Sequence, residues 1–200
     1  MALGQNASVA DNAEGAMALG QNANASATHS IAIGGEAHAS AENAIATGFK
    51  ANASGINSSA YGANAVASGK NATATGANSI AGAENATAYG AGATAYGNDV
   101  AVGFNAVVHQ DGSVAVGANS DVNSTNSVAL GADVVIGSSS DGAIALGQNA
   151  SVTDNAKGAM ALGQNATASA DSSIATGHDA NASGVTSIAT GTSAKAVSYT

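Results

Sequence analysis

Ser30-Ile31-Ala32-Ile33-Gly34 decides the fold, because close copies of this stretch recur along the whole chain. Taking the last glycine of each copy as a marker gives fourteen marker glycines, joined by thirteen intervals of 13 to 16 residues, most of them 14. They are Gly4, Gly20, Gly34, Gly48, Gly62, Gly76, Gly90, Gly103, Gly117, Gly131, Gly147, Gly163, Gly177 and Gly191. Such a short period from end to end is typical of stacked repeats rather than of a globular core.

The composition favours a thin, repetitive structure. Hydrophobic residues make up 45% of the 200 residues, but aromatic residues only 3%, and there is no Pro, Cys or Trp. So few large side chains cannot fill a thick core. Disordered segments are usually rich in charge and lack a strict hydrophobic period. Charged residues are only 8% here and the period is strict, so disorder is set aside.

The net charge of −9 limits which kinds of molecule the chain is expected to bind. The four basic residues (Lys50, Lys70, Lys157 and Lys195) do not cluster, which argues against a nucleic-acid partner. No apolar run approaches the roughly 18 residues of a membrane-spanning helix, so no direct membrane contact is expected. The sequence starts inside a repeat unit, at Ala2-Leu3-Gly4. We therefore expect a fragment of a longer array, forming one domain over residues 2–197.

Each repeat contains two strand patterns. The residue two positions before the marker glycine is always Ala. The residues one and three positions before it are mostly Ile, Val, Leu or Thr. This alternation predicts a strand with two distinct faces. After the glycine, the third and fifth positions are small or apolar and the fourth varies freely, which predicts a second strand. Two strands and two turns in fourteen residues make a very flat coil.

The invariant Ala is expected inside the coil, because only a size limit explains its restriction to a single small residue. The Ile, Val and Leu residues beside it must then point outward, forming an apolar stripe larger than a soluble monomer usually exposes. Such a stripe needs a partner, and the same stripe on another copy of this chain around a rotation axis would supply it. These residues form the predicted interface stripe: Ile31, Ile33, Ile45, Val100, Val102, Val114, Val116, Val128, Leu130, Ile144, Leu146, Ile174 and Ile188.

Two local departures modify this pattern. Between residues 59 and 89 the stripe softens to Ser, Thr and Tyr, so the assembly should be weaker there. The 16-residue coils carry extra residues near Asp11–Gly15, Ser138–Gly142 and Asp154–Gly158. Polar insertions that contain glycine predict exposed loops.

At these residues the chain resembles the head domain of the trimeric autotransporter adhesins, with its YadA-like head repeats. Fourteen copies of an Ala-x-Gly unit in register cover residues 2–197, and five of them read Ser-(Ile/Val)-Ala-x-Gly in full. The resemblance implies an all-β fold, a left-handed parallel β-roll or solenoid of about 13 coils of 14–16 residues, assembled as a parallel homotrimer. It also implies a stalk and an outer-membrane anchor beyond this chain, placing the head at the bacterial cell surface.

The residues show no arrangement for catalysis, a metal or a cofactor. His29, His38, His109 and His178 lie far apart at different repeat positions, and the acidic residues fall mostly in turns. Ten Asn-x-Ser/Thr sequons occur, including Asn6, Asn24 and Asn52. Asn at repeat turns beside Ser, Thr and Ala produces them almost automatically, so a structural origin is favoured over glycosylation.

The expected function is therefore that of a non-enzymatic, secreted virulence adhesin that attaches to host extracellular matrix proteins of the collagen, fibronectin or laminin class. A hexapeptide-repeat acyltransferase and an ice-binding solenoid are alternatives that the 14-residue step and the mixed outer positions disfavour. Ligand contacts are expected either in loops such as Asp11–Gly15 or on an outer ladder at the fourth position after the glycine. The outer ladder comprises Asn24, His38, Asn52, Thr94, Asp121, Thr167 and Asn181.

Overall fold

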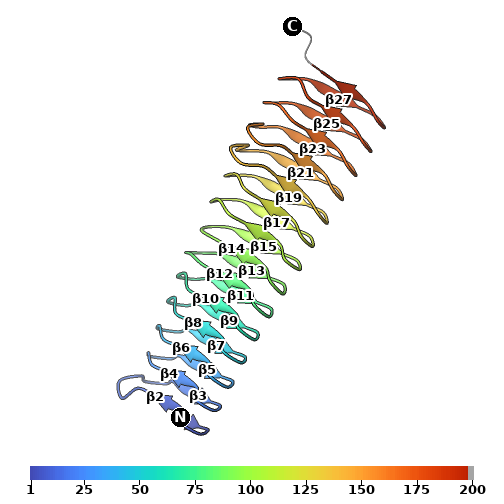
Figure 1. Cartoon of the computed structure of the whole chain (residues 1–200). Coiled ribbons are helices and arrows are strands. Elements are labelled where there is room, and N and C mark those ends of the chain that lie inside the picture. Colours follow the sequence, from blue (N-terminus) through green and yellow to red (C-terminus); the bar gives the residue numbers. More distant parts are fainter. Residues whose placement is uncertain (198–200) are drawn as a thin grey trace. The chain divides into compact units, whose positions relative to one another are not determined.

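A computed structural model describes residues 1–197 of the chain. Within them every regular element is a short β-strand, and no helix is present that could cross a membrane. The chain divides into two compact units, residues 1–98 and the residues from Asp99 onward. Figure 1 shows the coils of each unit stacked one upon the next. The expectation of a single domain stays a prediction.

In the first unit each coil gives one strand to each of two parallel sheets. The first sheet contains, in order, β1 (Ala2–Leu3), β3 (Met17–Leu19), β5 (Ile31–Ile33), β7 (Ile45–Thr47), β9 (Ser59–Tyr61), β11 (Thr73–Thr75) and β13 (Thr87–Tyr89). The second contains β2 (Ser8–Val9), β4 (Asn24–Ala25), β6 (His38–Ala39), β8 (Asn52–Ala53), β10 (Val66–Ala67), β12 (Ile80–Ala81) and β14 (Thr94–Ala95).

The second unit repeats this plan. Its first sheet contains β15 (Val100–Val102), β17 (Val114–Val116), β19 (Val128–Leu130), β21 (Ile144–Leu146), β23 (Met160–Leu162), β25 (Ile174–Thr176) and β27 (Ile188–Thr190). Its second contains β16 (Val107–Val108), β18 (Asp121–Val122), β20 (Val135–Ile136), β22 (Ser151–Val152), β24 (Thr167–Ala168), β26 (Asn181–Ala182) and β28 (Lys195–Ala196). The all-β parallel solenoid is thus confirmed.

The described strands make fourteen pairs, one more than the thirteen predicted coils. The glycine intervals omit half a coil at each end, because β1 precedes Gly4 and β28 follows Gly191. Strand pairing places each residue against the equivalent residue of the next coil, as in Ala46 against Ala60. Stacking of equivalent positions is what the strict period requires.

The invariant Ala lies inside the coil, as predicted. It is fully or almost fully buried in every coil from Ala18 to Ala189, and only Ala2, in the first coil, is exposed. The third and fifth positions after the glycine are buried from the second to the thirteenth coil. The two sheets therefore meet through small side chains, and this thin layer is the core of each unit.

The cores of the two units differ in side-chain size. In the first unit, buried alanines such as Ala67, Ala81 and Ala95 occupy the fifth position after the glycine. In the first four coils of the second unit the same position holds Val108, Val122, Ile136 and Val152, all fully buried, and the next two coils return to Ala168 and Ala182. These valines and the isoleucine are among the largest fully buried side chains of the described residues.

The marker glycine is required by both backbone conformation and space. Gly103 has φ +138°, a value that residues with a side chain rarely adopt. A Cβ atom at Gly103 would also lie 2.5 Å from the carbonyl oxygen of Gly117 in the next coil. Any side chain here would push neighbouring coils apart.

Asn residues form a hydrogen-bonded ladder along one turn edge of the first unit. Asn43 donates from Nδ2 to Oδ1 of Asn57 over 3.0 Å, and Asn57 donates to Asn71 over 3.2 Å. Asn71 donates to Asn85 over 3.1 Å, and Asn85 to Asn98 over 3.0 Å. The first four of these residues have φ between 56° and 58°, a conformation that Asn tolerates better than most residues. Asn therefore suits this position for two reasons: its amide bonds to the next coil, and its backbone accepts a positive φ.

Replacing Asn71 tests both contributions separately. Asn71→Ala removes two side-chain hydrogen bonds and places an alanine at φ 58°, so we expect a loss of about 1–3 kcal/mol in unfolding free energy. Asn71→Gly removes the same bonds but accepts the backbone conformation, so its loss should be smaller. Chemical denaturation measures both values. Equal losses in the two variants would show that backbone strain contributes nothing.

The 16-residue coils place their extra residues in two successive turns. Most of these residues are exposed, as predicted, but the central residue of each insertion is buried: Ala13, Ser140 and Ala156. The insertions therefore extend the core as well as the surface, which the prediction of exposed loops missed.

Residues 2–34 and residues 145–177 differ at only six positions, one of them Glu14 against Lys157. They form equivalent structures in their respective units. Ala2 pairs with Ala18 in the first unit, and Ala145 pairs with Ala161 in the second. The same five strands are thus built twice.

Candidate binding surfaces

The predicted interface stripe runs along the outward face of the first sheet in each unit. Its thirteen residues are all half-buried or exposed, with exposed fractions that reach 49% at Leu130 and 64% at Ile188. Neighbouring members stack in register, as Val116 does on Leu130. In the second unit an apolar row on adjacent strands, about 4.8 Å apart, gives a continuous surface of low polarity.

In the first unit this face becomes polar over three coils, β9, β11 and β13. Its outward residues there are Ser59, Tyr61, Thr73, Thr75, Thr87 and Tyr89. The opposite outward face changes the other way, with Val66 and Ile80 on β10 and β12. The polarity of the two faces is thus partly reversed in these coils.

The outer ladder lies on the outward face of the second sheet. Asn24, His38 and Asn52 stack on consecutive strands, and so do Thr167 and Asn181. These ladder residues are half-buried or exposed. The structure thus brings five of the seven predicted residues together in two groups.

The remaining two ladder residues are isolated among apolar neighbours. Val66 and Ile80 separate Thr94 from Asn52. Asp121 stacks between Val107 and Val135. Asp121 also lies 3.5 Å from Nε2 of His109, a histidine of the same outer face. The predicted ladder therefore consists of two stacked groups and two isolated residues rather than one continuous row.

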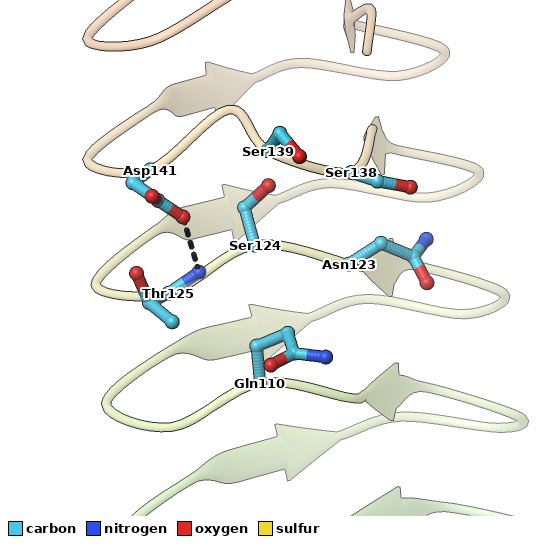
Figure 2. A pocket seen from close by; sticks show the side chains of 7 residues that line it. All are labelled: Gln110, Asn123, Ser124, Thr125, Ser138, Ser139 and Asp141. Carbon is cyan, nitrogen blue, oxygen red and sulfur yellow. Dashed lines mark hydrogen bonds between the residues drawn. The ribbon is translucent and has the colours of Figure 1, made fainter. Parts of the chain in front are cut away.

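A polar recess opens on the second unit where a 16-residue coil follows a 14-residue coil. Its volume is about 260 Å³. Figure 2 shows side chains from three successive coils around it, with Gln110 on the first, Asn123, Ser124 and Thr125 on the second, and Ser138, Ser139 and Asp141 on the third. No signal in the sequence indicated a recess, although its upper wall is one of the predicted insertions.

Buried serines build the wall behind this recess. Ser124 donates from its hydroxyl to the carbonyl oxygen of Gly137, and the backbone N–H of Ser140 donates to Ser124 Oγ over 2.8 Å. Ser140 Oγ in turn donates to Thr153 over 2.6 Å and accepts from the backbone N–H of Ala156. Because buried polar groups are costly when unpaired, this fully bonded row fixes the backbone of the coils it joins.

Acidic side chains also join successive coils. Asp141 accepts a hydrogen bond from the backbone N–H of Thr125 over 3.2 Å, which Figure 2 marks, and Asp154 accepts one from Ser138 over 2.7 Å. Asp99 is fully buried at the position where other coils carry Ser or Ala, and its Oδ1 accepts from the N–H of Ser113 over 2.9 Å. Alignment of the repeats could have singled out Asp99.

The histidines, which are common catalytic and metal-binding residues, do not come together in the structure. His29, His38, His109 and His178 are all exposed, and His178 lies 2.9 Å from Asp179. Among residues 1–197, no group of three or more His, Cys, Asp or Glu side chains is placed to hold a metal ion.

Flat two-strand coils, an apolar stripe on one sheet and polar segments on the other define a parallel β-solenoid repeat protein. The chain belongs to the YadA head domain repeat family, whose two-copy model matches residues 12–37, 39–65, 60–82, 67–93, 97–120, 111–133, 138–156 and 155–180. The predicted resemblance is confirmed. Heads of this family occur in surface adhesins that are generally non-enzymatic. No match to a curated protein was found.

Proposed function

We propose that this chain is the head of a bacterial surface adhesin and that it works as a parallel homotrimer of left-handed rolls. The interface stripe is the observation that carries the proposal. In the second unit the outward residue that lies three positions before the marker glycine is apolar in all seven coils, from Val100 to Ile188. Each such residue buried against a neighbouring chain would contribute about 1.5–3 kcal/mol.

The ligands of this head are host extracellular matrix proteins of the collagen, fibronectin or laminin class. Family membership supports an adhesive role, and the outer ladder offers polar side chains repeated about 4.8 Å apart along each unit. A long repetitive ligand could make many equal, weak contacts with such an array. Three copies in a trimer would add avidity. Parts of the protein beyond this chain would anchor it in the outer membrane.

The direct test combines assembly with adhesion. Sedimentation of the purified chain should give the mass of a trimer, and the same sample should bind plates coated with collagen, fibronectin or laminin. A monomer would contradict the interface stripe. A trimer that binds none of the three proteins would contradict the ligand class while leaving the assembly intact.

Added positive charge on the outer ladder tests where the ligand lies. Changing Asn24, His38 and Asn52 to Lys should weaken matrix binding in part, and changing Thr167 and Asn181 as well should weaken it further, because no single contact dominates. The trimer should persist, since these residues lie on the sheet opposite the stripe. The readout is binding to the coated plate at fixed trimer concentration.

The control places lysines on the same coils but at a turn edge, at Thr28, Glu42 and Ile56, and raises the net charge slightly more than the three-residue ladder variant does. Binding that falls equally in ladder and control variants would reflect net charge alone. If adhesion is unchanged after all ladder substitutions, the ladder does not contact the ligand, and the turns become the candidate binding site.

A further inference from the structure

The polar recess of the second unit offers hydrogen-bonding groups that the protein leaves unused. The side chains of Gln110, Asn123, Ser138 and Ser139 line it, and none of them bonds to another residue of the described chain. In the first unit, by contrast, turn amides such as Asn57 and Asn71 bond to one another. The recess therefore presents free amide and hydroxyl groups from neighbouring coils in one place.

The recess exists because coil length changes there. The coil from Gly131 to Gly147 has 16 residues and the two preceding coils have 14 each, so its edge carries an extra turn. Ser138 and Ser139 on this longer edge lie above Asn123 and Gln110 in Figure 2. The hydrogen bond from Thr125 to Asp141 and the buried Ser124 hold the longer edge to the shorter one. A site fixed in this way loses little entropy when a ligand binds.

The lining determines the class of ligand. It contains two amides, four hydroxyl-bearing side chains and one carboxylate, and no basic or aromatic residue. An anionic ligand would find no positive charge and would meet Asp141, while an apolar ligand would leave the amides unpaired. An uncharged ligand rich in hydroxyl groups can donate to and accept from the unbonded side chains of Gln110, Asn123, Ser138 and Ser139.

The size of the recess limits the ligand to a small unit. Its volume of about 260 Å³ lies just below the pockets of roughly 300–1,000 Å³ that hold drug-sized ligands. We infer that the recess binds one neutral sugar ring of a glycan chain. Binding of a single ring to such an open, polar site should be weak, with a dissociation constant of about 1–10 mM. The site lies within one chain, so it does not depend on the proposed trimer.

The test is titration of the isotope-labelled chain with neutral monosaccharides, followed through backbone amide signals in nuclear magnetic resonance spectra. The panel consists of glucose, galactose, mannose, fucose, N-acetylglucosamine and N-acetylgalactosamine, with sialic acid as the charged comparison. At least one neutral sugar should give saturable shifts confined to residues around Gln110, Asn123 and Ser138. Sialic acid should bind more weakly because of Asp141.

Two kinds of variant test the site itself. Gln110→Ala combined with Asn123→Ala should weaken binding about tenfold or more, since it removes both amides. Ser138→Trp should block the recess, because Ser138 is exposed and its side chain is unbonded. Gln148→Ala and Asn12→Ala are the controls, with the same residue types in exposed turns that make no side-chain hydrogen bond. They should leave binding unchanged.

The outcomes separate this site from the adhesin proposal. No saturable shift with any neutral sugar, or equal binding by the recess variants and the controls, would overturn the inference. Shifts at the same amides with a matrix peptide but with no sugar would also overturn the glycan class. Sedimentation of the same samples reports the trimer independently. Failure of one proposal therefore does not imply failure of the other.

Discussion

Four aspartates on the interface stripe are expected to dissociate the trimer and to leave a soluble, still β-structured chain. The substitutions are Val114→Asp, Val116→Asp, Val128→Asp and Leu130→Asp. These residues stack in register on β17 and β19, so the new charges lie beside one another within each chain. In the trimer three chains would bring them together away from water, at a cost of several kcal/mol per unpaired charge. Sedimentation measures the loss of assembly.

The control adds the same charge to the other sheet of the same unit. Aspartates replace Val135, Ser151, Thr167 and Asn181, which stack on β20, β22, β24 and β26. This variant should remain trimeric, because its charges face solvent. If the stripe variant also sedimented as a native-like trimer, the contact between chains would have to lie on a different face.

Leucine at an inner alanine should strongly destabilise the first unit. Ala74 is fully buried on β11, between Ala60 and Ala88 of the neighbouring coils. Strands β10 and β12 pack against β11 and contribute only the small side chains of Ala67 and Ala81 to the interior. Ala74→Leu should cost about 3 kcal/mol, at the upper end of overpacking effects. The expected fall in melting temperature is roughly 10–20 °C for a unit of this size.

The adjacent residue supplies the control. Thr73→Leu makes the same side chain at an outward, half-buried position where other coils carry Ile or Met. Its melting temperature should stay the same or rise, since the change extends the apolar stripe. Equal destabilisation by the two leucines would refute the assignment of inner and outer faces.

The period of the sequence was sufficient to predict the strands, their parallel pairing and the inner alanines. A strict repeat determines which residues stack, so Ala46 has to meet Ala60. The burial of Ser140 was missed because an insertion of two residues can bulge outward or fold inward with the same polar composition. The Asn side-chain ladder was also missed, since the sequence indicates a turn residue but not the direction of its amide.

The candidate site was less predictable for a related reason. The outer ladder follows from the repeat, and its stacked groups are where the sequence placed them. The recess follows from a mismatch in length between two neighbouring coils and from the amides that this mismatch leaves unpaired. Gln110 and Asn123 are the only amide side chains at their respective repeat positions, but this alone does not indicate a recess. Only the arrangement of three coils in space brings them together with Ser138.

The near-identical five-strand segments in the two units have a genetic consequence. Residues 2–34 and 145–177 share almost all of their sequence and are separated by a whole number of coils. An unequal crossover between the corresponding stretches of DNA would delete or duplicate the coils between them. Because Ala2 pairs with Ala18 just as Ala145 pairs with Ala161, the products would keep the strand register at the new junction. The number of coils in such a protein can therefore change in a single recombination event.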